Sequence, residues 1–310
     1  MSHHPRGRAN ALAAAVIGFM ALVFSVPMPL KAAPGEAPAL DVHTGIQYTE
    51  SGTPELIDIY EPKDAASADR PAVVYIHGGG WAAGGRGGVA IAAAHFIGRG
   101  YVFCSIDYRL TGEAKFPAQI EDCKCAIRFL RAHASQYHID PNRIGVWGDS
   151  AGGHLAALLG TTAKVPRLEG KGGWETESSA VEAVLDCYGP ANLEPEAFTD
   201  YKNPQGEKFL HQFLGDPIDP KLAHDASPIK FITKGDPPFL ILHGDKDDLV
   251  PVEQSQAFYD ALKAAGNDAT LKIIPGAGHG GSQFFSLDNI LLIDGFFERT
   301  LKPSTLAKSH

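Results

Sequence analysis

Short runs of β-branched, aromatic and other apolar residues recur along the chain and predict strands. The eight runs are residues 46–51, 56–62, 71–78, 101–108, 143–148, 183–189, 238–244 and 270–276. In the later runs apolar residues are consecutive rather than alternate, which is typical of strands covered on both faces. The first two runs are joined by Gly52, Thr53 and Pro54 and predict an antiparallel hairpin at a sheet edge.

From the third run onward, the predicted strands alternate with segments of helical periodicity. We expect helices at residues 89–100, 117–137, 151–163, 252–266 and 287–301, with Gly100 and Gly266 ending the first and fourth. Such alternation requires right-handed crossovers and a mainly parallel sheet. The pattern therefore predicts an α/β fold with a mostly parallel eight-stranded sheet and helices on both faces. In such sheets ligands bind at the carboxyl ends of the strands.

The first residues have the pattern of a secretory signal peptide, because Arg6 and Arg8 precede an uncharged apolar run at residues 11–26. That run is shorter than the roughly 20 residues that a membrane-spanning helix needs. We expect a cleaved signal peptide over residues 1–32, a secreted or periplasmic protein, and no stable membrane anchor. A short linker over 33–44, a single domain over 45–300 and a flexible tail over 301–310 complete the expected organisation.

The charge balance and the cysteines argue against two classes of function, nucleic-acid binding and metal binding. The chain has 27 Lys and Arg against 36 Asp and Glu, and this acidic balance is opposite to what a nucleic-acid partner would favour. Of the four cysteines, Cys104 and Cys187 lie in predicted strands, while Cys123 and Cys125 point to different faces of a predicted helix. We expect them to be buried apolar side chains rather than disulfides. No second ligand cluster accompanies them, so a metal site is not expected.

The stretch GDSAGG at residues 148–153 lies between a predicted strand and a predicted helix. Gly-x-Ser-x-Gly can arise by chance in a glycine-rich chain, so its setting carries the argument. A strand, a sharp turn and a helix form the setting of a nucleophile elbow, in which Ser150 would project above the sheet. The N–H group of Ala151 would then stand at a helix start, where it can stabilise a developing oxyanion.

A second glycine cluster, HGGGW at residues 77–81, follows the third predicted strand. It lacks the lysine and hydroxyl residues of a phosphate-binding P-loop. Consecutive glycines let backbone N–H groups turn toward a ligand. We therefore expect Gly79, Gly80 and Ala151 to form an oxyanion hole, and His77 to hold the loop rather than act as a base.

The general base follows from chain order. In hydrolases with such an elbow, the acid and then the histidine follow the serine. Only His279 and His310 lie beyond residue 243, and His310 ends a tail without periodicity. His279 follows the last predicted strand directly, and we expect it to be the base.

The acid is less clearly specified. Asp245, Asp247 and Asp248 all follow the strand at residues 238–244, and each could accept a hydrogen bond from the base and stabilise its protonated form. Residue types alone do not choose among these three carboxylates.

Together these motifs resemble the α/β-hydrolase superfamily, in particular its HGGG-bearing secreted esterases, namely the hormone-sensitive-lipase-like group and relatives similar to bifunctional feruloyl and acetyl xylan esterases. The resemblance covers most of residues 45–300 and rests on HGGGW at 77–81, SIDYRL at 105–110, FPAQIED at 116–122, GDSAGGHLA at 148–156, LDCYGPANL at 185–193, HGDKDDLVP at 243–251 and GAGHG at 276–280. It implies an α/β-hydrolase fold. The family pattern H-G-x-x-D-x-x-V-P implies Asp247 as the acid. The resemblance also implies that substrate choice lies in the variable segments 161–181 and 193–234.

The expected function is that of a serine esterase that cleaves acetyl, feruloyl or other short acyl esters of small molecules or plant polysaccharides through an acyl-enzyme. No metal or organic cofactor is expected. One alternative is a serine peptidase similar to prolyl oligopeptidase, whose elbow usually carries an aromatic residue where this chain has Ala151. The other is a non-catalytic hydrolase-fold binding protein, which would typically lack one of the three catalytic side chains.

Overall fold

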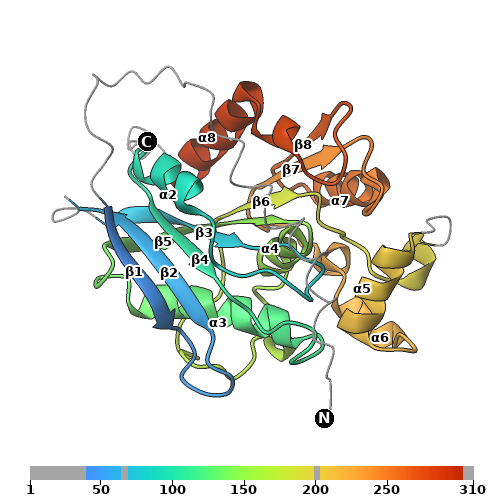
Figure 1. The fold of residues 1–310 in the computed structure, drawn as a ribbon, viewed down its shortest axis with the longest axis horizontal. Coiled ribbons are helices and arrows are strands. Elements are labelled where there is room, and N and C mark those ends of the chain that lie inside the picture. Colours follow the sequence, from blue (N-terminus) through green and yellow to red (C-terminus); the bar gives the residue numbers. More distant parts are fainter. Residues whose placement is uncertain (1–39, 64–68, 199–202, 303–310) are drawn as a thin grey trace, which may run out of the picture.

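A single sheet organises the chain in the computed structural model, which describes residues 40–63, 69–198 and 203–302 (Figure 1). The strands are β1 (Leu40–Gln47), β2 (Leu56–Pro62), β3 (Arg70–Ile76), β4 (Val102–Ile106), β5 (Ile139–Asp149), β6 (Ala183–Cys187), β7 (Phe239–Gly244) and β8 (Ala269–Ile274). The sheet has eight strands in the order β1-β2-β4-β3-β5-β6-β7-β8. β2 pairs antiparallel with β1 and β4, and the pairs from β4 to β8 are parallel. The predicted fold class is confirmed.

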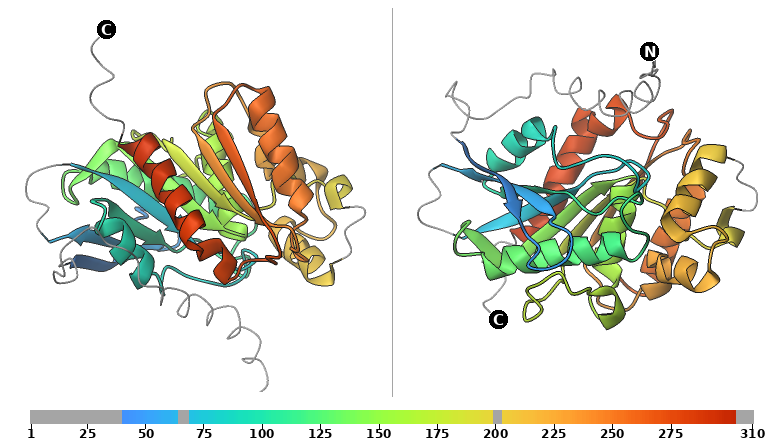
Figure 2. Two further views of the ribbon diagram at one scale, coloured as in Figure 1. Left: turned by 90° about the horizontal axis from the view of Figure 1, so that it is seen from above. Right: turned by 60° about the horizontal axis from the view of Figure 1, so that its bottom comes forward.

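Helices cover both faces of this sheet (Figure 2). One face packs against α3 (Ala118–Ala132), α4 (Ala151–Thr161) and α7 (Val252–Ala264), and the other against α2 (Ala90–Ile97) and α8 (Leu287–Leu301). Neighbouring residues of a strand serve opposite cores: Val74 faces the first set of helices, whereas Val73 and Tyr75 face α2 and α8. This double burial explains why the runs are apolar at consecutive positions.

The first strand differs from the expectation. It begins at Leu40 and ends at Gln47, so the predicted strand at 46–51 is mostly the following turn, and part of the predicted 33–44 linker belongs to the sheet. The bounds of this strand could not be predicted from apolar residues, because it is an edge strand with mostly exposed side chains and a register shift between His43 and Ile46. The predicted antiparallel hairpin is present. The predicted signal peptide and most of the predicted tail lie outside the described residues.

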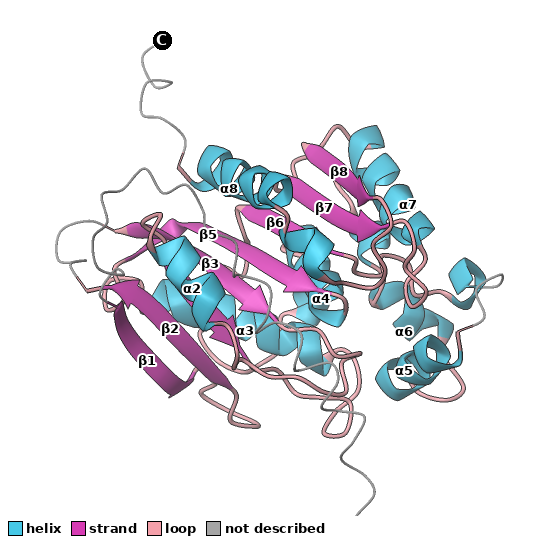
Figure 3. Ribbon diagram, turned by 45° about the horizontal axis from the view of Figure 1, so that its top comes forward, coloured by secondary structure: helices cyan, strands magenta, loops and turns pink. Residues whose placement is uncertain are grey.

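Two further helices were not expected from the sequence: α5 (Pro204–Leu214) and α6 (Pro220–Asp225). Both lie beyond the carboxyl ends of the parallel strands, and the arrows of β5 and β7 point toward them in Figure 3. They belong to the variable segment 193–234, so this segment covers the end of the sheet at which ligands are expected.

The other variable segment, residues 161–181, packs elsewhere. Trp174 donates its indole N–H to the carbonyl oxygen of Tyr48 at 2.8 Å, and Arg128 of α3 donates to the carbonyl oxygen of Gly173 at 3.0 Å. Segment 161–181 therefore packs against α3 and the β1–β2 hairpin. Among the described helices, none is both long enough and apolar enough to cross a membrane.

Candidate active site

Ser150 occupies the sharp turn between β5 and α4. Its φ and ψ of 53° and −118° lie in a region that residues other than glycine rarely adopt. The turn brings backbone segments very close together, which the glycines on either side of Ser150 permit because they have no side chain. A Cβ atom on Gly152 would lie 2.0 Å from the carbonyl oxygen of Ile76, and one on Gly148 would lie 2.1 Å from the carbonyl oxygen of Gly152. These contacts exclude any side chain at either position and fix the height of Ser150 above the sheet.

His279 and Asp247 lie in line with this serine. The Nε2 atom of His279 is 2.8 Å from the Oγ atom of Ser150, and its Nδ1 atom is 2.7 Å from the Oδ2 atom of Asp247. The ring of Tyr188 packs edge-on against the His279 ring, with centroids 4.8 Å apart. The structure therefore brings together the three side chains that sequence reasoning placed at the ends of β5, β7 and β8.

The carboxyl group of Asp247 is fully shielded from solvent and densely hydrogen-bonded. Its Oδ1 atom accepts backbone N–H bonds from Leu249 and Val250 at 2.9 and 2.8 Å. Its Oδ2 atom lies 3.2 Å from the Nε2 atom of His243. Burial alone raises the pKa of this carboxyl, but the hydrogen bonds from His243 and His279 outweigh it and hold the pKa well below its ordinary value. Asp247 is therefore ionised at neutral pH, as an orienting acid must be.

The HGGGW loop lies opposite the elbow. Gly79, Gly80 and Trp81 have consecutive positive φ angles of 116°, 60° and 56°, and Gly80 and Trp81 line the same pocket as Ser150. Within the described parts of the chain, the N–H groups of Gly79 and Gly80 have no hydrogen-bond partner. Ala151 lines this pocket as well, and its N–H group, in the first turn of α4, has no acceptor within the helix. The geometry thus suits the oxyanion hole expected at these three residues.

His77 lies below this loop, stacked on the ring of Tyr108 with centroids 4.3 Å apart. Its Nδ1 atom donates to the carbonyl oxygen of Gly78 at 2.8 Å. Burial lowers the pKa of His77, so the ring is neutral and packs as part of the loop. These contacts fit the expectation that His77 supports the loop instead of acting as the base.

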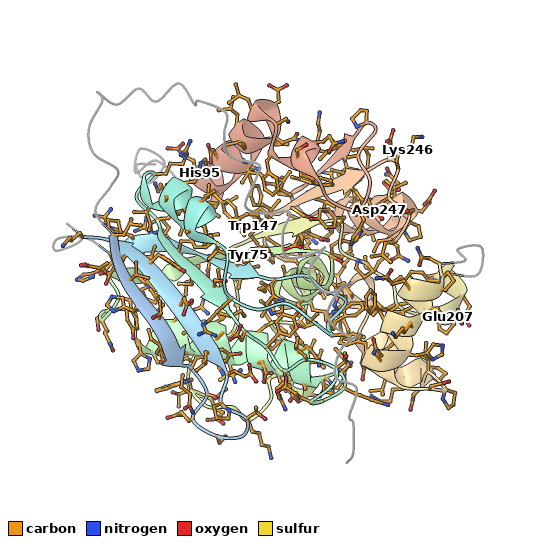
Figure 4. All side chains as sticks on the ribbon, in the orientation of Figure 1. Tyr75, His95, Trp147, Glu207, Lys246 and Asp247 are labelled. Atoms are coloured by element: carbon orange, nitrogen blue, oxygen red, sulfur yellow. The ribbon has the colours of Figure 1, made fainter. Side chains whose placement is uncertain are left out.

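A pocket of about 650 Å³ opens beside Ser150. Its walls are mostly apolar and come from the HGGGW loop, the segment after β6, and α5 with its flanking loops. The lining side chains include Trp81, Leu193, Phe209, Leu210, Ile218 and Val250. Glu207 of α5 and Asp247 lie on the same side of the molecule in Figure 4. No residue of 161–181 lines this pocket, so of the two variable segments only 193–234 can contact a substrate here.

Sequence reasoning missed several residues that support the site. His243 is fully buried beneath Asp247 and contacts Ser255 Oγ at 2.6 Å, yet it attracts attention in the sequence only as part of the HGDKDD motif. α5 carries a readable signal, because Asn203 caps it and Pro204 follows at its first position. Among the described residues, no group of three or more His, Cys, Asp or Glu side chains could hold a metal ion.

Comparison with known proteins identifies the family. The BD-FAE family model matches residues 57–262 of the chain. The chain belongs to the BD-FAE family. Among curated proteins similar to this BD-FAE chain is esterase LipC of Mycobacterium tuberculosis, 35% identical over 236 residues that cover 73% of this chain and 57% of LipC. The BD-FAE chain spans a little over half the length of LipC and of two further curated esterases of the same organism, LipQ and LipM.

Solved structures extend this likeness over nearly whole chains. A truncated carbohydrate esterase from gut microbiota superposes on the BD-FAE chain with a TM-score of 0.74 at 32% identity, covering 86% of this chain and 98% of the other. Thermogutta terrifontis esterase 2, phosphonylated by sarin, gives a TM-score of 0.71 at 33% identity and covers 88% and 100%. The expected α/β-hydrolase fold and the resemblance to esterases are confirmed for this BD-FAE member.

Proposed function

We propose that the protein is a carboxylic ester hydrolase that acts through an acyl-enzyme on Ser150. The observation that carries the proposal is the pair of hydrogen bonds that links Ser150 through His279 to Asp247, with distances of 2.8 and 2.7 Å, beside a pocket that Gly80 and Ala151 also line. The esterase relatives support the same reaction class.

In the proposed mechanism, Ser150 Oγ attacks the ester carbonyl carbon while His279 Nε2 takes the hydroxyl proton. Asp247 accepts the Nδ1–H of His279 and stabilises the imidazolium that forms. The N–H groups of Gly79, Gly80 and Ala151 bind the oxyanion of the tetrahedral intermediate. His279 then protonates the leaving alcohol, and a water molecule activated by the same ring releases the acid.

Short acyl esters, including acetyl and feruloyl esters, are the proposed substrates, with plant polysaccharides as one source. The pocket has the size of an ordinary small-molecule site. One solved relative is described as an acetyl ester-xyloside bifunctional hydrolase, and Thermogutta terrifontis esterase 2 has been solved with propionate and butyrate bound. Measuring kcat/KM on acetyl, feruloyl and long-chain esters tests this proposal, and a preference for long chains would contradict it.

Ser150→Ala tests the mechanism. We expect hydrolysis of p-nitrophenyl acetate to fall by about 10³-fold or more, because only the oxyanion hole and substrate binding remain. Ser178→Ala, at an exposed serine, should retain full activity. Unchanged turnover in Ser150→Ala would refute the acyl-enzyme. Rapid cleavage of prolyl p-nitroanilides by the wild type would favour the peptidase alternative.

We also propose that the protein is exported, on the strength of the charged and apolar pattern in residues 1–32. Mass spectrometry of the protein purified from its native host should find an N-terminus near residue 33. An intact N-terminus in that sample would contradict a cleaved leader.

A further inference from the structure

Trp81 is held in an unusual backbone conformation directly after the two glycines of the proposed oxyanion hole. Its φ of 56° lies in the left-handed region, which a bulky residue adopts only when its surroundings enforce it. The side chain is 4% exposed. The N–H groups of Ala82 and Ala83, the residues after Trp81, both donate to the carbonyl oxygen of Gly79 at 3.1 Å. The peptide plane that carries the Gly80 N–H is therefore held by the same turn that contains Trp81.

Three contacts hold this tryptophan. Its carbonyl oxygen accepts the N–H of Thr111 at 2.8 Å. Its ring stacks on Phe213 of α5, with centroids 4.2 Å apart and planes within 10° of parallel. Its indole Nε1–H donates to the Nδ1 atom of His154 at 3.2 Å. The last contact is directional and crosses from the HGGGW loop to α4.

His154 is fully buried in the first turns of α4, where its N–H bonds the carbonyl oxygen of Ser150 at 3.0 Å. Because Nδ1 accepts from Trp81, the ring proton resides on Nε2, which donates to the carbonyl oxygen of Ala226 at 2.7 Å. Both ring nitrogens are thus satisfied in one tautomer. The helix that presents the N–H of Ala151 is thereby tied to the loop that presents Gly79 and Gly80.

We propose that His154 is a positioning residue that sets the separation of the two halves of the oxyanion hole through its hydrogen bond with Trp81. The inference rests on the proposed function, since it concerns the same site. Donors that bind the oxyanion act mainly in the transition state, so a shift in their positions lowers kcat and leaves KM nearly unchanged.

Two substitutions separate positioning from stability. In His154→Asn, the amide oxygen stands near the place of Nδ1 and can still accept from Trp81, whereas the bond to Ala226 is lost. In His154→Gln, the longer amide can reach Ala226 but not Trp81. Each variant loses one buried hydrogen bond, so comparable falls in Tm are expected. His133→Gln is a matched control, because His133 packs edge-on against Trp174, on the other variable segment, with centroids 4.5 Å apart.

The measurement is kcat for p-nitrophenyl acetate per active site, with active sites counted from the burst of acylation. We expect His154→Gln to lose about tenfold in kcat, less than the loss of a whole oxyanion donor, and to keep KM within about twofold. His154→Asn should stay within about threefold of wild type, and His133→Gln should match wild type.

Three results would overturn the proposal: equal kcat in the Asn and Gln variants, a loss that appears in KM alone, or a kcat that follows Tm in all three variants. A peptidyl or alkyl boronic acid, which mimics the tetrahedral intermediate, gives an independent measurement. Its affinity should fall in His154→Gln by the same factor as kcat/KM. An inactive Ser150→Ala together with a fully active His154→Gln would refute only this inference, whereas an active Ser150→Ala would refute the proposed function.

Discussion

Asp247 shows how much of a side chain's role is decided by its immediate neighbours. Three aspartates follow β7 within a few positions, and residue type alone does not distinguish them. In the structure Asp247 points inward and accepts from His279, Leu249 and Val250. Asp245 instead accepts the N–H of Gly276 at 2.6 Å, and Asp248 is exposed. The family pattern therefore points to the same carboxylate, Asp247, that lies beside His279 in the structure.

Asp247→Asn should lower kcat by about 10⁴-fold, because the amide cannot stabilise the imidazolium and favours the wrong tautomer of His279. Asp248→Asn is the matched control and should retain wild-type kcat. Steady-state hydrolysis of p-nitrophenyl acetate measures both. A loss of similar size in the two variants would show that loop geometry, rather than the buried carboxylate, governs turnover.

Asp186, at the centre of the sheet below the elbow, predicts a pH effect on stability. Its carboxyl is fully buried, and burial raises its pKa to about 7 despite one N–H bond from Gly189. A carboxyl with a raised folded-state pKa contributes stability that is present below its unfolded pKa and is lost as pH rises through the folded value. The free energy of unfolding should therefore decline between about pH 4 and pH 7 by up to about 4 kcal/mol from this group alone.

Asp186→Asn removes that titration while Asn can keep the acceptor for Gly189. Denaturant unfolding from about pH 4 to pH 8 should give a flatter stability profile in this variant than in wild type. Asp248→Asn serves again as the comparison and should keep the wild-type slope. Parallel profiles in Asp186→Asn and wild type would show that folding does not raise the pKa of this carboxyl.

At the scale of elements, α5 brings the variable segment 193–234 into contact with the loops of the candidate active site. A Cβ atom on Gly80 would lie 2.6 Å from the ring of Phe209, so this ring rests directly on the glycine loop. Asn203, the N-terminal cap of α5, also donates a hydrogen bond to the carbonyl oxygen of Asp248, in the loop after β7 that carries Asp247. The helix thus touches both sides of the pocket mouth and can limit the size of the acyl group.

Phe209→Ala should shift acyl preference toward larger groups. The vacated ring volume removes a steric limit, so the ratio of kcat/KM for butyrate over acetate should rise by about tenfold. Lys208→Ala, at the exposed neighbour on α5, should leave the ratio unchanged. Initial rates on a series of p-nitrophenyl esters give the answer, and an unaltered ratio in Phe209→Ala would place the acyl group in another part of the pocket.

The strands and helices that could be predicted from the sequence are more deeply buried than those that could not. Strands β3 to β7 lie between two layers of helices, and their consecutive apolar residues made them visible. In β1 only Leu40, His43 and Ile46 are half-buried and the register shifts between the last two, so its apolar residues are too sparse to define its start. α5 buries only Phe213 and Leu214, and its place over the pocket depends on contacts with residues far away in the chain.

At the scale of the whole molecule, the four cysteines lie in the described interior as free thiols. Burial raises the pKa of Cys104, Cys123, Cys125 and Cys187, so the reactive thiolate is disfavoured at each. The expectation that the four cysteine side chains are buried is confirmed. Ellman's reagent should therefore label none of them rapidly in the native protein and all four in guanidinium chloride, with no effect of reducing agents on Tm. Fewer than four thiols in denaturant would indicate a disulfide.

The candidate site could be predicted largely because the sheet brings strand ends together. Ser150, Asp247 and His279 each follow a recognisable strand, and a parallel sheet places such positions at one edge. His154, Trp81 and His243 act through side-chain contacts between elements, and no local pattern in the sequence reports which partners they meet. Motifs therefore revealed the groups proposed to touch the substrate and one supporting residue, His77, while the contacts of His154, Trp81 and His243 required coordinates.

The tight passage of Gly148 and Gly152 past neighbouring backbone has a practical consequence for protein engineering. These contacts are made by main-chain atoms, so the serine keeps its place whatever side chains surround the pocket. A combinatorial library confined to Phe209, Leu210 and Ile218 should therefore yield almost entirely folded members that still react with a fluorophosphonate probe. Selection from such a library could alter substrate preference without first having to rebuild a nucleophile.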